Sequence, residues 1–543
     1  MSTNSNTATQ PIRFYHQGRV IDVEGVHPTR TVLDWLREDA HCAGTKEGCN
    51  EGDCGACTVV IGELAAPGAP GAVDGLNLQT VNACIQFLPT LHGKALFTVE
   101  DLKRQCSAGS PGAAAATTPH GAKRATVPLH PVQQAMVDCH GSQCGFCTPG
   151  FVMSLWSSYE HHQADGTRPS RQQLADELSG NLCRCTGYRP ILDAGQRMFD
   201  LPAVRLDSRP VVEALKGIQG DAGFEYCAPL GARTDRFHAP RTLDDLAALR
   251  QANPRAVVLA GSTDIGLWVN KQFRDLGDII FVGDVAELKR VEERQGEQGA
   301  ELYIGAGASL EAAWSALAAR FEGLTDVWLR FASPPIRHAG TMGGNVANGS
   351  PIGDSAPVLM ALDAQIELRQ GARVRRMPLS DFYVDYMKNR LEPGEFVQAV
   401  AVPMSVAARR VRAYKISKRF DCDISALCGA FSLELDGQGR VKQVRLAFGG
   451  MAATVKRAAR AEAALTGKPW TQEAVDAARQ ALAEDFTPLS DMRASAAYRL
   501  QVAANLITRL WLETRLQDAL PVQETSVWSV MPHAVASVGT QGA

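Results

Sequence analysis

The stretch GTKEGCNEGDCGACTVV, residues 44–60, decides how the first part of this chain folds. It places Cys49, Cys54 and Cys57 in a C-x4-C-x2-C array, and Cys84 follows further along the chain. Four thiolates are the ligands that a [2Fe–2S] cluster requires. The glycines between the cysteines suit a loop that bends tightly and aims its N–H groups at sulfur.

The spacing of this first cage is the one used by plant-type ferredoxins, a tight triad with a distant fourth cysteine. A structural zinc site is the alternative, but zinc sites usually pair two short cysteine hooks. The spacing therefore favours an iron–sulfur cluster held by Cys49, Cys54, Cys57 and Cys84. Cys42, which precedes the triad, is expected to be a buried thiol.

A second group of cysteines lies in SQCGFCTPG (142–150) and GNLCRCTGY (180–188), which supply Cys144, Cys147, Cys183 and Cys185. Apolar spacing predicts helices over 130–140, 150–162 and 170–180, the last capped by Gly180. Zinc remains an alternative for this second cage. The C-x-C hook is cramped for zinc, and the cage upstream favours a second cluster. Cys139 is expected to pack within its helix.

Composition places the chain among ordinary globular proteins, with 543 residues, 45% hydrophobic, 21% charged and a net charge of −3. The length allows about three or four domains. The charge gives no basic field for nucleic acid, and no apolar run approaches the ~20 residues that cross a bilayer. The first ten residues, MSTNSNTATQ, lack the features of a signal peptide, so a soluble cytoplasmic protein is expected. In that compartment the 14 cysteines indicate metal or redox roles instead of disulfides.

Local patterns divide the chain into segments. Residues 11–33 predict two short strands and the start of a helix capped by Thr31. Residues 67–75 and 107–124 predict loops, with a domain boundary in the second, and about 205–230 predicts a linker. A mixed α/β region to about 405 precedes an α+β segment with a strand in 440–450 and two long amphipathic helices. The last residues, 537–543, are expected to fray.

Two later segments have the composition expected of a site that binds a large polar ligand. RAVVLAGSTDIGL (255–267) is an apolar strand that runs into a turn of small residues, which lets backbone N–H groups approach a phosphate. Residues 330–362 are dense in Gly, Ser, Asn and Pro although they interrupt apolar sequence. An ordinary turn and an irregular loop without a ligand are the alternatives. IGAGASL (304–310) lacks the third glycine of a dinucleotide fingerprint.

With their flanks, CHGSQCGFCTPGFVMS (139–154) and LSGNLCRCTGYRPI (178–191), the two cages resemble the iron–sulfur domains of the xanthine dehydrogenase and aldehyde oxidase family, the molybdenum hydroxylases. The resemblance implies a multidomain α+β fold. It comprises a β-grasp ferredoxin-like domain (11–104), a helical [2Fe–2S] domain (126–204), a vanillyl-alcohol-oxidase-type FAD-binding domain (231–405) and a C-terminal domain like that of the CO dehydrogenase flavoprotein (408–522).

The same resemblance implies a set of cofactor contacts. Gln143 would lie against the pterin of a molybdenum cofactor, Phe331 would stack on the adenine of FAD, and Asp354 would hold a hydroxyl of FAD. Lys415 would lie near the flavin ring. Contacts to the pyrophosphate and ribityl chain would come from Leu259, Ala260, Gly261, Ser262, Thr263, Asp264, Ile265, Thr341, Gly343, Gly344 and Asn345.

Two positions near the expected flavin are distinctive. Cys422 occupies the place where vertebrate members of the family carry an acidic residue beside flavin N5. That departure bears on how the flavin's electrostatics are tuned and how the acceptor docks. Tyr386 matches an aromatic residue over the flavin near the nicotinamide site, with simple packing as the alternative.

By this resemblance the chain is expected to be the electron-transfer subunit of a xanthine dehydrogenase. It offers no candidate for the catalytic glutamate of the molybdenum domains, so no catalytic residue is assigned. A molybdopterin-binding partner would oxidise hypoxanthine and xanthine to urate, with electrons passing through two clusters and FAD to NAD⁺ in an α2β2 assembly. The alternatives are a subunit of an aldehyde or N-heterocycle hydroxylase, a stand-alone iron–sulfur flavoprotein reductase, and a zinc-binding interaction protein.

Overall fold

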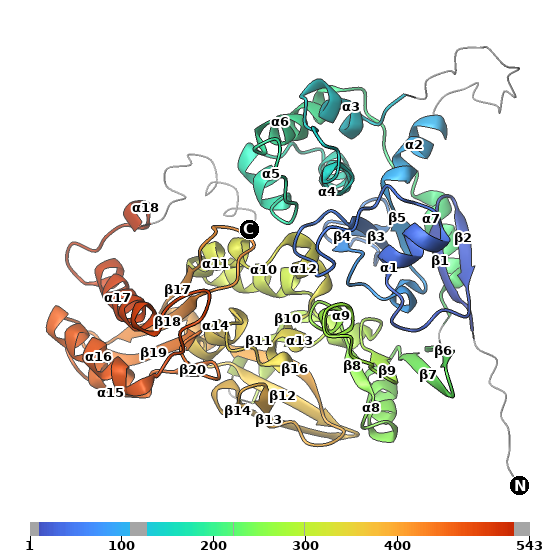
Figure 1. The fold of residues 1–543 in the computed structure, drawn as a ribbon. Coiled ribbons are helices and arrows are strands. Elements are labelled where there is room, and N and C mark those ends of the chain that lie inside the picture. Colours follow the sequence, from blue (N-terminus) through green and yellow to red (C-terminus); the bar gives the residue numbers. More distant parts are fainter. Residues whose placement is uncertain (1–9, 109–127, 221, 298, 526–543) are drawn as a thin grey trace, which may run out of the picture. The chain divides into compact units, whose positions relative to one another are not determined.

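The computed structural model describes residues 10–108, 128–220, 222–297 and 299–525 (Figure 1). The chain forms two compact units. Unit 1 comprises Met1–Arg241, Arg255–Asp284 and Pro334–Ala339, and unit 2 comprises Thr242–Pro254, Val285–Ser333 and Gly340–Ala543. Nearly all of the predicted loop at 107–124 and the whole of the predicted frayed end at 537–543 lie outside the described residues.

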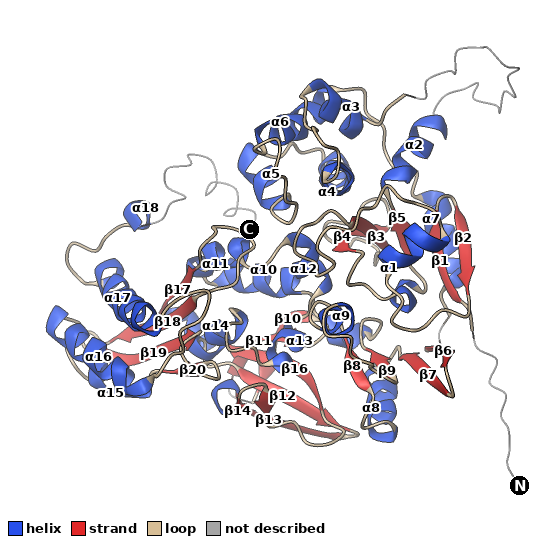
Figure 2. Cartoon of the chain, viewed as in Figure 1, coloured by secondary structure: helices blue, strands red, loops and turns tan. Residues whose placement is uncertain are grey.

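Unit 1 begins with a five-stranded sheet in the order β2-β1-β5-β3-β4 (Figure 2). The two predicted N-terminal strands are confirmed as an antiparallel hairpin, and β1 also pairs in parallel with β5. Thr31 caps the first helical turn as predicted, because its hydroxyl accepts the Asp34 N–H at 3.0 Å. The strands are β1 (Ile12–His16), β2 (Arg19–Val23), β3 (Thr58–Leu64), β4 (Leu76–Asn82) and β5 (Ala95–Phe97).

Helices follow in the second part of unit 1, where α4 lies among α3, α5 and α6 (Figure 1). The three predicted helices are present. Their bounds are α3 (Pro131–Asp138), α4 (Thr148–Asp165), α5 (Arg171–Glu177) and α6 (Arg189–Arg197). The predicted cap at Gly180 is wrong, because α5 ends at Glu177 and Leu178 is its C-cap. Gly180 instead lies where another loop approaches closely, since a Cβ on Gly55 would come within 2.2 Å of the Gly180 oxygen.

The linker predicted at about 205–230 is also wrong. This segment contains α7 (Arg209–Ile218) and β6 (Phe224–Leu230). Val211 and Leu215 lie one helical turn apart and are buried in the core shared with the helices. Phe224 and Tyr226 alternate along β6 and are buried in the core of the first sheet. The segment therefore connects two parts of unit 1 as packed structure.

A second sheet completes unit 1, in the order β6-β7-β9-β8. Its strands β7 (Arg233–Ala239), β8 (Val257–Leu259) and β9 (Ile279–Phe281) bury Phe237 and Leu259 in the same core as the ferredoxin-like strands. Two short helices, α9 (Ile265–Asn270) and α12 (Pro334–Ala339), also belong to this unit. By packing, the start of the predicted FAD domain thus joins the first cluster domain.

The described part of unit 2 contains two larger antiparallel sheets, β10-β11-β16-β12-β13 and β17-β18-β19-β20, and the two-stranded sheet β14-β15 (Figure 2). The predicted strand at 440–450 is β19 (Val441–Gly449), and the two predicted amphipathic helices are α16 (Gln472–Asp485) and α17 (Ala496–Thr514). A core between the second sheet and α15, α16 and α17 includes Leu446, Leu482 and Leu510. The mixed content of both units agrees with the predicted multidomain α+β fold.

The remaining bounds complete the chain. In unit 2 the strands are β10 (Val291–Gly296), β11 (Gly299–Gly305), β12 (Gln365–Gln370), β13 (Arg373–Pro378), β14 (Tyr383–Asp385), β15 (Lys388–Asn389), β16 (Phe396–Pro403), β17 (Arg410–Ile416), β18 (Leu427–Leu435), β19 (Val441–Gly449) and β20 (Lys456–Arg457). The α-helices not yet given are α1 (Val32–Asp34), α2 (Val99–Ala108), α8 (Leu243–Ala252), α10 (Leu310–Arg320), α11 (Thr325–Arg330), α13 (Met342–Asn348), α14 (Ser355–Ala361), α15 (Ala459–Leu465), α16 (Gln472–Asp485), α17 (Ala496–Thr514) and α18 (Val522–Thr525).

Candidate iron–sulfur and flavin sites

The first cage is formed by the glycine-rich loop before β3 and by Cys84, which follows β4. The Cys49 sulfur accepts the backbone N–H of Cys54 at 3.3 Å. Side-chain hydrogen bonds also join the Cys49 sulfur to those of Cys54 and Cys84, and the Cys84 sulfur to that of Cys57. The structure therefore brings the four predicted sulfurs together.

Local electrostatics in this cage favour a thiolate. Hydrogen bonds from the Cys54 and Cys84 side chains hold the pKa of the Cys49 thiol far below its ordinary value, although burial opposes them. Gly52 and Gly55 adopt φ values of 78° and 69°, which a side chain would disfavour. Four clustered sulfurs with backbone N–H donors suit a [2Fe–2S] cluster. Within the described residues, no three or more His, Cys, Asp or Glu side chains are arranged to hold a single metal ion.

In the second cage the sulfurs meet in two pairs. Cys144 hydrogen bonds with Cys185, and Cys147 with Cys183. Burial, reinforced by the Cys183 side chain, raises the pKa of Cys147 to about 12. The backbone N–H of Phe146 and the Cys185 side chain lower the pKa of Cys144. Cys144 and Cys185 are exposed, so this cage opens to the surface of unit 1.

The two cages touch through their backbones. The Leu182 N–H donates to the Cys54 carbonyl at 3.0 Å, which links a residue of the first cage to the neighbour of Cys183. Gly55 and Gly150 permit this approach, because a Cβ on Gly150 would come within 2.1 Å of the Gly55 oxygen.

Asn181 fixes the contact between the cages. Its side-chain amide donates to the Gly55 carbonyl at 3.0 Å and to the Thr58 hydroxyl at 3.1 Å, and its oxygen accepts from Ser154 at 2.7 Å. The side chain is buried. Sequence reasoning missed Asn181. Its place two residues before the first cysteine of the C-x-C hook was the available signal, but the partners that it would contact cannot be read from a pattern.

The segment Leu259–Ile265, expected to contact FAD, lies in unit 1 between β8 and α9. Ser262 has φ 61°, and its buried hydroxyl has no hydrogen-bond partner within the described chain. The Gly261 carbonyl accepts a hydrogen bond at 3.0 Å from the side chain of Gln86, which lies two residues after Cys84. An orphaned hydroxyl in a strained turn of small residues fits a polar ligand such as a phosphate group.

The other expected FAD contacts lie in unit 2. Thr341 caps α13 by accepting the Gly344 N–H at 3.0 Å. Gly343 is required for packing, because a Cβ there would come within 2.6 Å of the Ala306 Cα. The segment IGAGASL thus supplies the surface on which the Thr341–Asn345 turn rests.

Asp354 and Lys415 meet in a buried triad with Ser425. The Lys415 ammonium lies 2.6 Å from Asp354 Oδ2 and 2.7 Å from the Ser425 hydroxyl, which donates to Asp354 Oδ1 at 2.6 Å. The Asp354 and Lys415 side chains are only 3% and 2% exposed. Phe331 is also buried, and its ring lies 5.7 Å from that of Trp314.

Two further sequence positions have distinct environments. The Tyr386 side chain is 60% exposed, which excludes the interpretation that it simply packs in the core. Cys422 is half-buried with φ 50°, and its thiol lies 3.5 Å from the Ala332 carbonyl.

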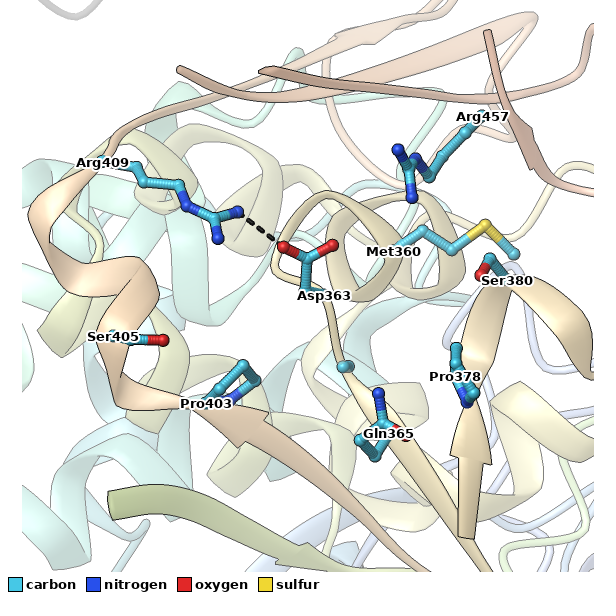
Figure 3. A pocket seen from close by; sticks show the side chains of 10 residues that line it. Met360, Asp363, Gln365, Pro378, Ser380, Pro403, Ser405, Arg409 and Arg457 are labelled. Atoms are coloured by element: carbon cyan, nitrogen blue, oxygen red, sulfur yellow. Dashed lines mark hydrogen bonds and ion pairs between the residues drawn. The ribbon is translucent and has the colours of Figure 1, made fainter. Parts of the chain in front are cut away.

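A pocket of about 390 Å³ lies within unit 2 (Figure 3). Arg409 pairs with Asp363 at its wall, at 2.7 Å. None of the residues predicted for a cofactor lines it. Among the described helices, none combines the length and apolar character needed to span a bilayer.

Four protein-family models match the chain in order. They are a 2Fe-2S iron-sulfur cluster binding domain at 14–87, a [2Fe-2S] binding domain at 118–196, the FAD binding domain in molybdopterin dehydrogenase at 232–405 and the CO dehydrogenase flavoprotein C-terminal domain at 412–514.

Curated relatives include proteins named xanthine dehydrogenase and aldehyde oxidase. Xanthine dehydrogenase of Emericella nidulans is 31% identical over 88% of this chain and 36% of its own length. Xanthine dehydrogenase of Drosophila subobscura is 29% identical over 96% of this chain and 41% of its own length. Aldehyde oxidase 4 of Cavia porcellus is 28% identical over 98% of this chain and 41% of its own length. The chain thus spans less than half of the length of these relatives.

Among solved structures, a carbon monoxide dehydrogenase chain from Hydrogenophaga pseudoflava is 29% identical. The match covers 50% of this chain and 94% of that one, with a TM-score of 0.47.

The fold and the matched domains define an iron–sulfur flavoprotein, an oxidoreductase component with two [2Fe–2S] domains and an FAD-binding domain. Over most of its length the chain is similar to xanthine dehydrogenases, and its matched domains are those of an iron–sulfur and FAD electron-transfer component of the molybdenum hydroxylases.

Proposed function

We propose that this chain carries electrons from a molybdopterin-binding partner through its second cage, its first cage and FAD to NAD⁺, in an enzyme that oxidises hypoxanthine and xanthine to urate. The hydrogen bond from the Leu182 N–H to the Cys54 carbonyl carries the proposal, because it joins the residue before Cys183 of the second cage directly to a cysteine of the first. The names of the relatives support xanthine as the substrate class.

In this proposal the eight cysteines hold two [2Fe–2S] clusters, and the domain boundaries are those expected from the sequence. When bound, the clusters would supply one-electron transfer and FAD the exchange between one-electron and two-electron chemistry. FAD would be held by the Leu259–Ile265 turn, the Thr341–Asn345 turn and Phe331. Asp354 would hold a hydroxyl of FAD and Lys415 would lie near the flavin ring, and their ion pair would fix the position of both charges.

The different exposures of the two cages support this direction of electron transfer. The second cage is exposed at Cys144 and Cys185, and beside them Phe146 and Tyr188 are 46% and 39% exposed. Exposed aromatic side chains beside a redox site fit a docking surface for a partner. Gln143 is exposed on the same hook and would meet the pterin there. Gln86, two residues after Cys84, donates instead to the Gly261 carbonyl of the expected flavin turn, which supports the first cage as the cluster that passes electrons to FAD.

The acceptor and the assembly are part of the proposal. NAD⁺ would approach the flavin beside the exposed Tyr386. The partner chain would bind molybdopterin, and the complex would be an α2β2 heterotetramer in the cytoplasm. Relatives named aldehyde oxidase and nicotinate hydroxylase favour an aldehyde or N-heterocycle as the second candidate substrate.

The test is purification of the complex from its native cells, followed by steady-state assays with NAD⁺. We expect a molybdenum-bearing chain to co-purify and urate to form from xanthine. Oxidation of nicotinate or an aldehyde without urate formation would move the substrate to the second candidate. NADH oxidation by this chain with no molybdenum-bearing partner would instead identify a stand-alone reductase.

A further inference from the structure

The end of α9, the helix that follows the expected flavin turn, contacts the backbone of the first cage. The Lys271 ammonium donates to the Cys49 carbonyl at 2.6 Å. The neighbouring Asn270 amide donates to the Cys84 carbonyl at 2.7 Å and to the Asn50 side chain at 3.2 Å. Two consecutive residues therefore hold the backbones of two proposed cluster ligands, one in the loop and one beyond β4.

Lys271 brings a positive charge to a cage loop whose own charged residues are mostly acidic. The cage loop itself contributes Lys46, Glu47, Glu51 and Asp53, so its carboxylates outnumber its ammonium groups. Lys271 reaches the loop from another element and lies 3.6 Å from Glu51, with side chains 42% and 43% exposed. The pair is partly open to water, so each charge acts on the cage with only partial compensation by the other.

We propose that Lys271 is a positioning residue that raises the reduction potential of the first cage, with Glu51 acting in the opposite sense. The inference rests on the proposed function, because it requires a [2Fe–2S] cluster in this cage. The step concerned is the gain of one electron from the cluster of the second cage, with no bond made or broken. A nearby positive charge stabilises the more negative, reduced form, and net charge is one of the determinants of cluster potential.

A physical consequence follows for the direction of transfer. The ammonium lies on the first cage and not on the second, so it shifts the electron distribution toward the cage nearest the Gly261 turn. Asn270 keeps this geometry in place because its amide fixes the Cys84 carbonyl. Lys271 thus makes the first cluster a better electron acceptor than the same cluster would be without this charge.

The experiment is a redox titration of the holoenzyme followed by electron paramagnetic resonance, comparing Lys271→Met, Lys271→Arg and Glu51→Gln with the wild type. We expect Lys271→Met to shift the one-electron distribution away from the first cluster by about tenfold, which is about 59 mV for one electron. Lys271→Arg keeps the charge and should stay near wild type, and Glu51→Gln should shift the distribution the other way.

Lys216→Met is the matched control, because it removes the same charge from an exposed position on α7 of the same unit. It should leave both potentials unchanged. The inference would be overturned if Lys271→Met shifted the reduction potentials of both clusters equally. It would also be overturned if both clusters were present in this variant and neither potential shifted. If Lys271→Met fails to fold, an unchanged potential in Glu51→Gln would overturn it. Absence of two cluster signals in the wild type would instead remove the proposed function.

Discussion

Asp354, Lys415 and Ser425 show how much a single buried residue can matter in this protein. The Asp354 carboxylate and the Lys415 ammonium are both buried away from water, and Asp354 Oδ2 lies 2.6 Å from Lys415 Nζ. Removing one partner leaves an uncompensated buried charge, whereas removing both does not. The triad is therefore expected to behave as one unit.

Substitution of the triad tests this coupling. We expect Lys415→Met or Asp354→Asn alone to lower the free energy of unfolding by about 3–5 kcal/mol, and the double variant to lower it by less than the sum. Urea unfolding of the four proteins measures the coupling. Lys442→Met breaks a surface pair with Glu434 and should cost less than about 1 kcal/mol. Additive losses in the double variant would contradict the account.

Substitution of Asn181 should also lower the free energy of unfolding by a measurable amount. Asn181→Ala leaves the Gly55 carbonyl and the Ser154 hydroxyl without their side-chain partner, and we expect a loss of about 1–3 kcal/mol in unfolding free energy. Gln134→Ala, which removes an exposed amide on α3, should change stability by no more than about 0.5 kcal/mol. Equal stabilities of the two variants in thermal unfolding would show that the cage junction does not depend on Asn181.

Glu160 predicts a pH dependence of stability. Burial raises the pKa of this α4 carboxyl to about 7, and the nearby Asp74 raises it further. The Leu206 N–H and Arg205 oppose this shift and lower the pKa. Between about pH 4.5 and 7 the folded state binds the extra proton, so its stability falls as pH rises. Relative to Glu160→Gln, the wild type should lose up to about 3 kcal/mol across this window. Parallel urea-unfolding profiles of the two proteins against pH would refute this assignment.

At the scale of elements, the junction between the cages depends on two glycines that face each other. Gly150→Ala should push α4 away from the cage loop, because its Cβ would come within 2.1 Å of the Gly55 oxygen. We expect faster hydrogen exchange of the Leu182 amide, which donates to Cys54. Gly217→Ala, in open space on α7, is the control and should leave that amide unchanged. Unchanged Leu182 protection in Gly150→Ala would contradict the close contact.

The elements also show what the sequence could predict. The hairpin, the Thr31 cap and helices α3 to α5 follow from local periodicity and capping chemistry. The eight cysteines were expected from their spacing, and the structure brings them into two groups. Residues 205–230 were mistaken for a linker although Val211 and Leu215 have helical spacing, because the partners that bury these side chains are distant in the sequence. Asn181, Asn270 and Lys271 were missed for the same reason, since their roles are long-range contacts.

At the scale of the molecule, the chain combines two kinds of redox domain with different surroundings. The second cage is exposed and the first is held by a backbone junction on one side and by α9 on another. This arrangement suits one-electron transfer between fixed points, with the protein supplying position and charge.

The most direct test of the account is the metal and sulfide content of the intact purified chain, with its absorption spectrum. We expect about four iron atoms and about four acid-labile sulfides per chain, from two [2Fe–2S] clusters, in a brown protein with a flavin shoulder. A colourless protein with about two zinc atoms and negligible iron would contradict it.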